Sequence, residues 1–254
     1  MFAALHRHPF AVEAFFRHSL VLTFAYPEEL LRELLPSCLR VDAYEGQGFL
    51  AIALVQTESL RPAGWPAWTG RDFFLSGYRI FCRYRRQDGR ELRGLRILRS
   101  YTDRRAMVWS GNLFTRYHYH HCHVDSHRDD RTLSYTITTA GAEADVSVAV
   151  RLDQAATAPP AGSPFPDLAV ARRFAGPLPF TFGYEDATRT MVIVQGVRQH
   201  WLPMPVQVES LRCGFLERPP FTRAPLRLAN AFLIERIPYS WKRGEVEHVA
   251  ESAP

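Results

Sequence analysis

Residues 115–124 read TRYHYHHCHV and bring four histidines, two tyrosines and a cysteine into one short segment. Imidazoles bind transition metals and exchange protons near neutral pH, and phenols donate hydrogen bonds to carbonyl or carboxylate groups. If residues 116–124 form a strand, alternate side chains share a face. The two faces are then Arg116, His118, His120, Cys122 and Val124, and Tyr117, Tyr119, His121 and His123.

Each face carries a His-x-His pair, which is the simplest candidate for a metal site. Zinc or iron held by such a pair needs a third ligand from a neighbouring strand. The other histidines considered as that ligand are His18, His127 and His200. The pair alone is more typical of imidazoles that hydrogen-bond in a polar interior or face water. We therefore expect no metal, and an enzyme that uses a metal on His118 and His120, or on His121 and His123, stays as an alternative hypothesis.

Other chemistries lack their motifs. The sequence has no Gly-x-Ser-x-Gly elbow, P-loop, dinucleotide-binding fingerprint or His-Glu-x-x-His, so we expect no cofactor. The net charge of +5 comes from dispersed arginines without a block of like charges, and we expect no nucleic-acid partner. Lys242 is the only lysine, so it is the only side-chain candidate for an amine nucleophile.

The hydrophobic pattern predicts an α+β protein dominated by an antiparallel sheet that is curled or closed. A helix is expected after Pro27, with leucines on one face, and a second one after Asp103, which would cap it. An Asp-Gly pair at 88–89 predicts a hairpin between two β-rich runs. Two strands joined by a turn at 45–48 are expected within 39–60. The other expected strands are near 18–25, 73–85, 91–101, 116–124, 131–139, 145–152, 188–197, 206–216 and 228–241.

Apolar residues make up 46% of the chain, which is typical of an ordered globular protein, and we expect a single domain over residues 1–254. The four cysteines are far apart and form no Cys-x-x-Cys, which favours buried thiols over a disulfide framework. No run of eighteen apolar residues and no signal-like segment is present. These features predict a soluble cytoplasmic protein with no membrane partner.

Several strings, in the same order, resemble the acetoacetate decarboxylase superfamily, and within it the uncharacterised bacterial YqjF-like branch, a domain of unknown function. RHSLVLTFAYPEELLRELLP at 17–36 resembles its opening strand and leucine-rich helix. LPSCLRVDAYEGQGFLAIALV continues in the same register, and GYRIFCRYRR followed by SGNLFTRYHYHHCHV resembles the central part. RQHWLPMPVQVESL resembles a late segment of the branch. The similarity covers residues 15–240.

The resemblance implies a cone-shaped antiparallel β-barrel with flanking strands, a few short helices and an interior pocket, often in a homo-oligomer. In the decarboxylases a Gly–aromatic–Pro–Lys–Lys string supplies the Schiff-base lysine, and a second lysine beside it helps to keep the reactive amine neutral. This chain reads Arg116-Tyr117-His118-Tyr119-His120 in the same place. Tyr119 replaces the reactive lysine, and a phenol cannot form an imine with a ketone.

The site implied by this resemblance is a pocket lined by Tyr119, with Tyr117 and His121 on the same strand face. We take Tyr119 and His121 as the candidate proton donors, and Tyr117 as a substrate-binding residue. Arginine could clamp a carboxylate with two hydrogen bonds. The candidates are Arg17, which matches a decarboxylase arginine, and Arg79 and Arg99 on the central hairpin. A decarboxylase glutamate aligns near Leu75.

The sequence therefore predicts a small-molecule-binding protein without Schiff-base decarboxylase activity. Acid–base chemistry of the lyase or isomerase type on a small carbonyl or carboxylate compound is one hypothesis. A metal-dependent enzyme and a non-catalytic ligand carrier or scaffold are the alternatives, and the sequence leaves open whether the protein is an enzyme.

Overall fold

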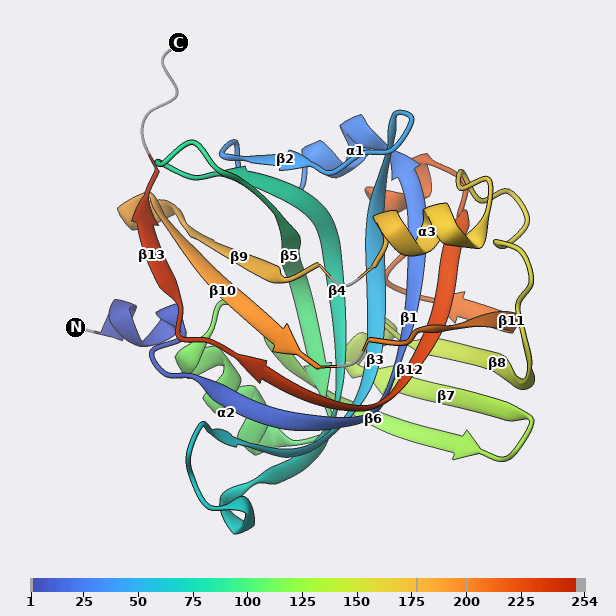
Figure 1. Cartoon of the computed structure of the whole chain (residues 1–254), viewed down its shortest axis with the longest axis horizontal. Coiled ribbons are helices and arrows are strands. Elements are labelled where there is room, and N and C mark those ends of the chain that lie inside the picture. The colour runs from blue at the N-terminus through green and yellow to red at the C-terminus, as the bar shows by residue number, and fades with distance from the viewer. Residues whose placement is uncertain (1, 177, 200, 250–254) are drawn as a thin grey trace.

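The computed structural model describes residues 2–176, 178–199 and 201–249. The described chain is built mainly from strands, with few helices (Figure 1). The helices are α1 (Glu28–Arg32), α2 (Arg105–Phe114) and α3 (Leu168–Phe174). The strands are β1 (Val12–Pro27), β2 (Leu39–Val41), β3 (Gln47–Pro62), β4 (Arg71–Arg85), β5 (Glu91–Thr102), β6 (Tyr119–Arg128), β7 (Thr132–Thr139), β8 (Val146–Ala155), β9 (Phe180–Glu185), β10 (Thr190–Arg198), β11 (Met204–Cys213), β12 (Leu228–Trp241) and β13 (Glu245–His248). The expected α+β fold with a largely antiparallel sheet is confirmed.

Local sequence signals explain the main elements. α1 follows Pro27 and carries Glu28 and Glu29 in its first turn, where acidic side chains complement the helix dipole. The β4–β5 hairpin turns at Gly89, whose φ of +83° is a left-handed conformation that glycine adopts without strain. β4 then pairs with β5 along nearly its whole length.

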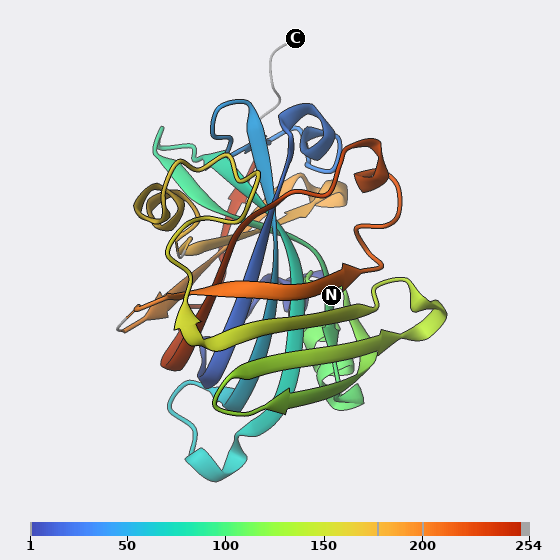
Figure 2. The ribbon, with the colours of Figure 1, turned by 90° about the vertical axis from the view of Figure 1, so that its right-hand side faces the viewer.

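The sheet closes on itself twice around a shared wall. β12, β1, β3, β4 and β5 are consecutive neighbours and form that wall. On one side β6, β7, β8 and β11 connect β5 back to β12, and on the other side β9 and β10 make the same connection. Figure 1 shows β9 and β10 to the left of the wall and β7, β8 and β11 to its right. Figure 2 shows β7, β8 and β11 running at a steep angle to the strands of the wall.

The two rings of strands have different interiors because the wall strands alternate their side chains between them. On β4, Phe74, Tyr78 and Ile80 are buried in the apolar core enclosed by β6, β7, β8 and β11. Leu75 and Arg79 instead line a cavity in the ring closed by β9 and β10. One ring is therefore packed solid, and the other keeps a hollow.

Two local expectations are wrong. The strand expected at 116–124 begins only at Tyr119, because His118 has a left-handed φ of +51° that interrupts an extended chain. Asp103 does not cap α2: its carboxylate accepts a hydrogen bond from the Phe74 backbone N–H at 2.8 Å, and no side chain caps the helix at Arg104. The strands β9 and β13 and helix α3 were not among the expected elements.

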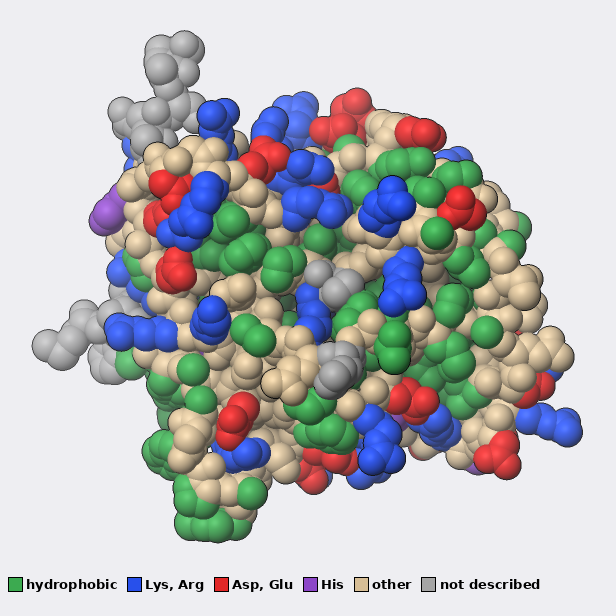
Figure 3. Space-filling model, in the orientation of Figure 1, with side chains coloured by type: hydrophobic (Ala, Val, Ile, Leu, Met, Phe, Trp, Pro, Cys, Tyr) green, Lys and Arg blue, Asp and Glu red, His purple; other side chains and the backbone are tan. Residues whose placement is uncertain are grey.

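Surface and thiol chemistry follow the sequence expectations where the structure describes them. The four cysteines are free; three are buried and Cys38 is half-buried. Figure 3 shows Lys and Arg side chains interspersed with Asp and Glu across one face, without a single basic block. Among the described helices, none has the length and apolar character needed to cross a membrane.

Two buried histidines predict that the protein loses stability in acid. Burial lowers the pKa of His8 to about 4, and burial, with Arg128 nearby, does the same for His18, whose ring contacts the Tyr135 hydroxyl. Both imidazoles are favoured in the neutral form in the folded state. Their contribution is therefore complete above the unfolded pKa of 6.5 and is lost as the pH falls from there toward 4.

We expect the free energy of unfolding to fall by roughly 2 kcal/mol for each of these two histidines between pH 7.5 and pH 5. Urea unfolding at both pH values measures the change. His18→Gln should remove part of the pH dependence, whereas His127→Gln, at an exposed position, should leave it intact. Equal slopes for the wild type and His18→Gln would contradict this assignment.

Candidate functional site

A cavity of about 120 Å³ lies in the ring of strands closed by β9 and β10. Its walls come from β1, β3, β4, β5, β9, β10 and β12, from the chain just before β6, and from the segment after α3. Most lining side chains are apolar or aromatic. The side chains with polar groups are Ser19, Arg79, Ser100, Tyr117, Tyr119, Thr181, Arg198, Trp201, Tyr239 and Trp241. A second hollow of about 520 Å³ adjoins it and shares Ala175, Gly176, Trp201 and Phe232 with it.

Arg79 places a buried guanidinium in this cavity. Its side chain lies over Gly77, where an added Cβ would come within 3.0 Å of the Arg79 Nε. Within the described residues Arg79 makes no hydrogen bond and has no carboxylate within 4.0 Å, and its Nε is buried without a partner. Its remaining accessible surface faces the cavity. Burial lowers the pKa of Arg79, but a guanidinium keeps its proton at neutral pH.

Arg198 supplies a second guanidinium from the end of β10. Its charge lies 4.6 Å from the centre of the Trp201 ring and 5.7 Å from that of Tyr239, so aromatic faces hold it. Tyr239 comes this close because it lies directly over Gly196, where a Cβ would meet the Tyr239 hydroxyl at 2.1 Å. Arg198 also has no acidic partner among the described residues.

Tyr117 and Tyr119 form part of the wall and are 9% and 7% exposed. Burial raises the pKa of the Tyr119 phenol well above its ordinary value, and the Arg79 guanidinium offsets this only in part. Burial, together with the neighbouring Tyr119, also raises the pKa of Tyr117. Both phenols are therefore protonated at neutral pH and can donate hydrogen bonds.

The polar atoms that this cavity leaves unpaired can all donate hydrogen bonds. The Arg79 Nε, the Tyr117 hydroxyl and the Trp201 Nε1 are buried without a hydrogen-bond partner. Among the described residues that line the cavity there is no Asp, Glu, His, Cys or Lys. Buried polar groups are usually paired, and an unpaired one costs about 1–3 kcal/mol. The wall is positively charged and lacks acidic acceptors, which suits an anion rich in acceptor oxygens.

Asn112 of α2 fixes the backbone of Tyr119. Its side-chain oxygen accepts a hydrogen bond from the Tyr119 N–H at 2.8 Å, and its amide donates to the Tyr119 carbonyl at 2.9 Å. The ring of Tyr119 packs against Gly111, where a Cβ would come within 2.4 Å of it. This close approach requires glycine at 111. A short helix therefore orients the Tyr119 phenol in the cavity wall.

Glu185 holds the chain just before the two tyrosines. It is 4% exposed and forms ion pairs with Arg116 and with Arg7, the latter at 2.7 Å, and it accepts a hydrogen bond from the Thr188 hydroxyl at 2.6 Å. Although burial opposes ionisation, these partners hold the pKa of Glu185 below its usual value. The ion pair with Arg116 ties the segment that carries Tyr117 to β9.

His121 does not share the cavity with Tyr119, contrary to the expected common face. It lines an open groove between α2 and β7, together with His123 and the exposed Trp109. The left-handed His118 breaks the alternation between Tyr117 and Tyr119. Tyr119 and His121 both belong to β6, but His121 lies two residues farther along the strand, beyond the end of the cavity and beside the groove.

Arg17 and Arg99 also lie outside the cavity, whereas Arg79 is inside. Arg17 pairs with Glu58 on the outer surface, and Arg99 pairs with Glu143 at 2.9 Å. β-Bulges explain both positions. The pairing of β1 with β3 shifts between Phe16 and His18, and that of β4 with β5 shifts between Tyr78 and Arg79. An extra residue in a strand reverses which side chains face inward beyond it.

Of the two histidine pairs proposed for the alternative metal site, His121 and His123 lie together with ring centres 5.1 Å apart, but no third ligand joins them among the described residues. His118 and His120 are exposed, His18 contacts Tyr135 in the packed core, and His127 lies beside Asp129. His200 is outside the described residues. Within residues 2–176, 178–199 and 201–249, no three His, Cys, Asp or Glu side chains are placed to hold one metal ion.

Lys242 and Leu75 were also singled out by the sequence. Lys242 is exposed in the connection between β12 and β13 and does not line the cavity. Leu75, which the family resemblance aligns near a decarboxylase glutamate, does line it. Arg198, Trp201, Tyr239 and Asn112 were not predicted as site residues. Their signals, a strand-end arginine, aromatic residues and one helical asparagine, are common in sequences of any function.

The fold is shared with solved acetoacetate decarboxylase-like enzymes. Acetoacetate decarboxylase from Legionella pneumophila subsp. pneumophila superposes with a TM-score of 0.60 at 12% identity, covering 96% of this chain and 89% of that one. An acetoacetate decarboxylase-like enzyme from Sphingomonas wittichii RW1 gives 0.57 at 14% identity, with coverages of 95% and 93%. The enduracididine biosynthesis enzyme MppR complexed with pyruvate gives 0.55 at 12% identity, with 95% and 89%. At these identities the likeness establishes the fold.

No curated protein matches the chain. A family model does match, and it spans residues 13–248, which include every strand of both rings except the first residue of β1. This match agrees with the branch suggested by the sequence strings and with the acetoacetate decarboxylase-like fold. The chain therefore belongs to the family described as DUF2071, an uncharacterized conserved protein (COG2071).

Proposed function

We propose that the protein binds a small oxo acid in the cavity of the β9–β10 ring, with Arg79 as the carboxylate anchor. Tyr119 and Tyr117 donate hydrogen bonds to the carbonyl or carboxylate oxygens of the ligand. The observation that carries the proposal is the set of unpaired donors, the Arg79 Nε, the Tyr117 hydroxyl and the Trp201 Nε1, around a cavity without acidic side chains among its described residues.

The size of the cavity supports a small ligand. A hollow of about 150 Å³ accommodates benzene, so 120 Å³ suits a compound of roughly six or seven non-hydrogen atoms. Three- and four-carbon oxo acids fall in this range. A structural neighbour with the same fold, MppR, is described in complex with pyruvate, which is such a compound.

The chemistry of the cavity favours binding and carbonyl polarisation over covalent catalysis. Imine formation needs a neutral amine beside the substrate, and the only lysine, Lys242, is exposed outside the cavity. His121, proposed from the sequence as a proton donor, faces another groove. The raised pKa values of the two tyrosines suit phenols that stay protonated and donate, rather than bases that titrate near pH 7.

Calorimetry with tag-free protein tests this function. Pyruvate and acetoacetate should bind, and their neutral amides should bind at least about tenfold more weakly, because a charge-assisted contact with Arg79 is lost. Treatment with acetoacetate and borohydride should leave the protein mass unchanged. Equal affinity for acids and amides, or a reduced adduct on Lys242, would overturn the proposal.

A further inference from the structure

Arg79 and Arg198 enter the cavity from opposite walls. The ring that encloses it runs β12, β1, β3, β4, β5, β9, β10 and back to β12. β4, which carries Arg79, is separated from β10, which carries Arg198, by β5 and β9 on one side and by β3, β1 and β12 on the other. Both side chains line the same hollow of about 120 Å³, so the two guanidiniums face one space.

The side chains packed around Arg198 leave its N–H groups without hydrogen-bond acceptors among the described residues. The Trp201 and Tyr239 rings stabilise its charge through their faces, but they accept none of its five N–H groups. No hydrogen bond or ion pair joins the Arg198 side chain to any described residue. Three other half-buried arginines have acidic partners: Arg83 and Arg93 share Asp42, and Arg116 contacts Glu185. Arg96 instead donates a hydrogen bond to the Phe182 carbonyl.

The two cations therefore share a small space whose described walls contain no anion. Burial lowers the pKa of each, and the charge of Arg79 contributes to the lowering for Arg198, which indicates that they are close enough to repel. One carboxylate neutralises one of them. A ligand with an acidic group at each end neutralises both and places each group on a separate guanidinium fork.

We propose that Arg198 forms a second anion subsite and that the ligand class is a short dicarboxylate, with or without an oxo group. This inference rests on the proposed function, because Arg79 holds the first carboxylate. The apolar side chains that line the same cavity, including Leu75 and Phe16, suit the short carbon chain between the acids.

Malonate and malonamate test the second subsite, because they have the same number of heavy atoms and differ by one charge. Calorimetry on the full chain at pH 7.5 should give malonate a Kd roughly tenfold lower than that of malonamate. Arg198→Gln should weaken malonate binding by about the same factor, and it should change the Kd of malonamate by less than about twofold. Arg198→Lys keeps the charge and should retain most of the preference.

Arg173→Gln is the matched control, since it removes an exposed arginine at the adjoining hollow and should leave both affinities unchanged. Urea unfolding of each variant confirms that it is folded. Equal binding of the two probes by the wild type, or equal weakening of both by Arg198→Gln, overturns the second subsite alone. If the protein binds none of the three compounds malonate, malonamate and pyruvate, the proposed function is overturned as well.

Discussion

Replacing Arg79 with methionine is expected to weaken pyruvate binding by about a hundredfold and, at the same time, to stabilise the ligand-free protein. The first effect follows from the loss of the charged donor on which the carboxylate rests. The second follows because Arg79 is a half-buried charge, with a fully buried Nε, that has no acidic partner among the described residues. Methionine has no charge and reaches as far as the arginine Nε, so it fills the path of the Arg79 stem over Gly77 without the cost of desolvation.

The sign of the stability change distinguishes a binding residue from a structural one. If Arg79 stabilised the fold through contacts, its removal would lower the free energy of unfolding; we expect an increase of about 1 kcal/mol instead. Urea unfolding and calorimetry with pyruvate measure the two quantities on the same sample. A variant that binds normally and unfolds more easily would refute the role assigned to Arg79.

Arg99→Met and Arg17→Met serve as controls on neighbouring strands. The sequence makes both arginines candidates on the same grounds as Arg79, but they pair with Glu143 and Glu58 outside the cavity. Their removal should leave pyruvate affinity unchanged and alter the free energy of unfolding by less than about 1 kcal/mol, which is typical of exposed ion pairs.

The contrast among these three arginines shows what the sequence can and cannot predict. Alternation along β4 is regular, so Arg79 falls inward together with Leu75 and Phe81. The bulge opposite Tyr78 and the one near Arg17 reverse the inward face of their strands, and a bulge has no reliable signature in a single sequence. The pattern therefore predicts the strands well and the direction of individual side chains less well.

Tyr119 and His121 illustrate the same limit. The family resemblance places Tyr119 at the position of a reactive lysine, and the structure places its ring on the cavity wall. The extension to His121 assumes that two residues on one strand face reach the same hollow, but His121 lies beyond the end of the cavity and lines the groove beside α2. Arg198 could not be assigned from the sequence, because its role depends on β10 closing against β12, a contact between distant parts of the chain.

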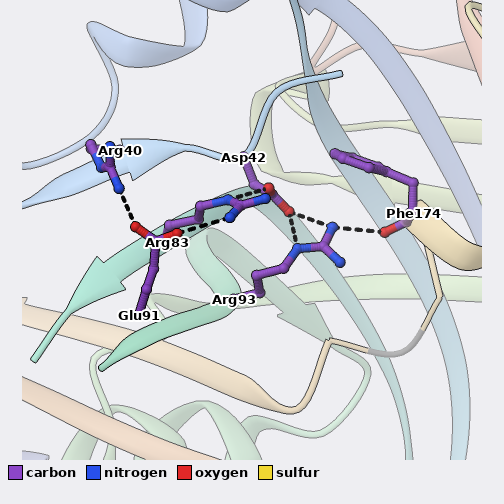
Figure 4. Close-up of polar contacts among 6 residues, drawn as sticks. All are labelled: Arg40, Asp42, Arg83, Glu91, Arg93 and Phe174. Atoms are coloured by element: carbon purple, nitrogen blue, oxygen red, sulfur yellow. Dashed lines mark hydrogen bonds and ion pairs between the residues drawn. The ribbon is translucent and has the colours of Figure 1, made fainter. Parts of the chain in front are cut away.

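Asp42 supports the part of the cavity lining that lies next to α3. Asp42→Asn is expected to lower the free energy of unfolding by about 3 kcal/mol. Asp42 is completely buried and binds Arg83 at 2.6 Å and Arg93 at 2.7 Å (Figure 4). Removing its charge leaves two guanidiniums without their shared acid. Both arginines are about one-third exposed, so water solvates part of their charge. The loss in the free energy of unfolding should therefore lie at the lower end of the range for breaking a buried ion pair.

Glu91→Gln provides the matched control within the same cluster. Glu91 pairs with Arg40 and with Arg83 at 2.8 Å, but its side chain is 33% exposed. Solvent screens this pair, so its loss should cost less than about 1 kcal/mol. Urea unfolding of the two variants compares a buried carboxylate with an exposed one that contacts the same arginine. Equal losses would show that the burial of Asp42 is not the decisive factor.

The effect of Asp42→Asn should extend to the cavity, because Arg93 also holds the end of α3. Its guanidinium donates to the Phe174 carbonyl at 3.1 Å and lies 4.8 Å from the Phe174 ring centre. The residues that follow, Ala175, Gly176 and Leu178, line the cavity. Hydrogen exchange should therefore show faster exchange at 171–176 in Asp42→Asn than in Glu91→Gln, with pyruvate binding weakened about threefold to tenfold. If exchange at 171–176 is unchanged while global stability falls strongly, the Asp42 cluster stabilises the fold but does not affect the ligand site.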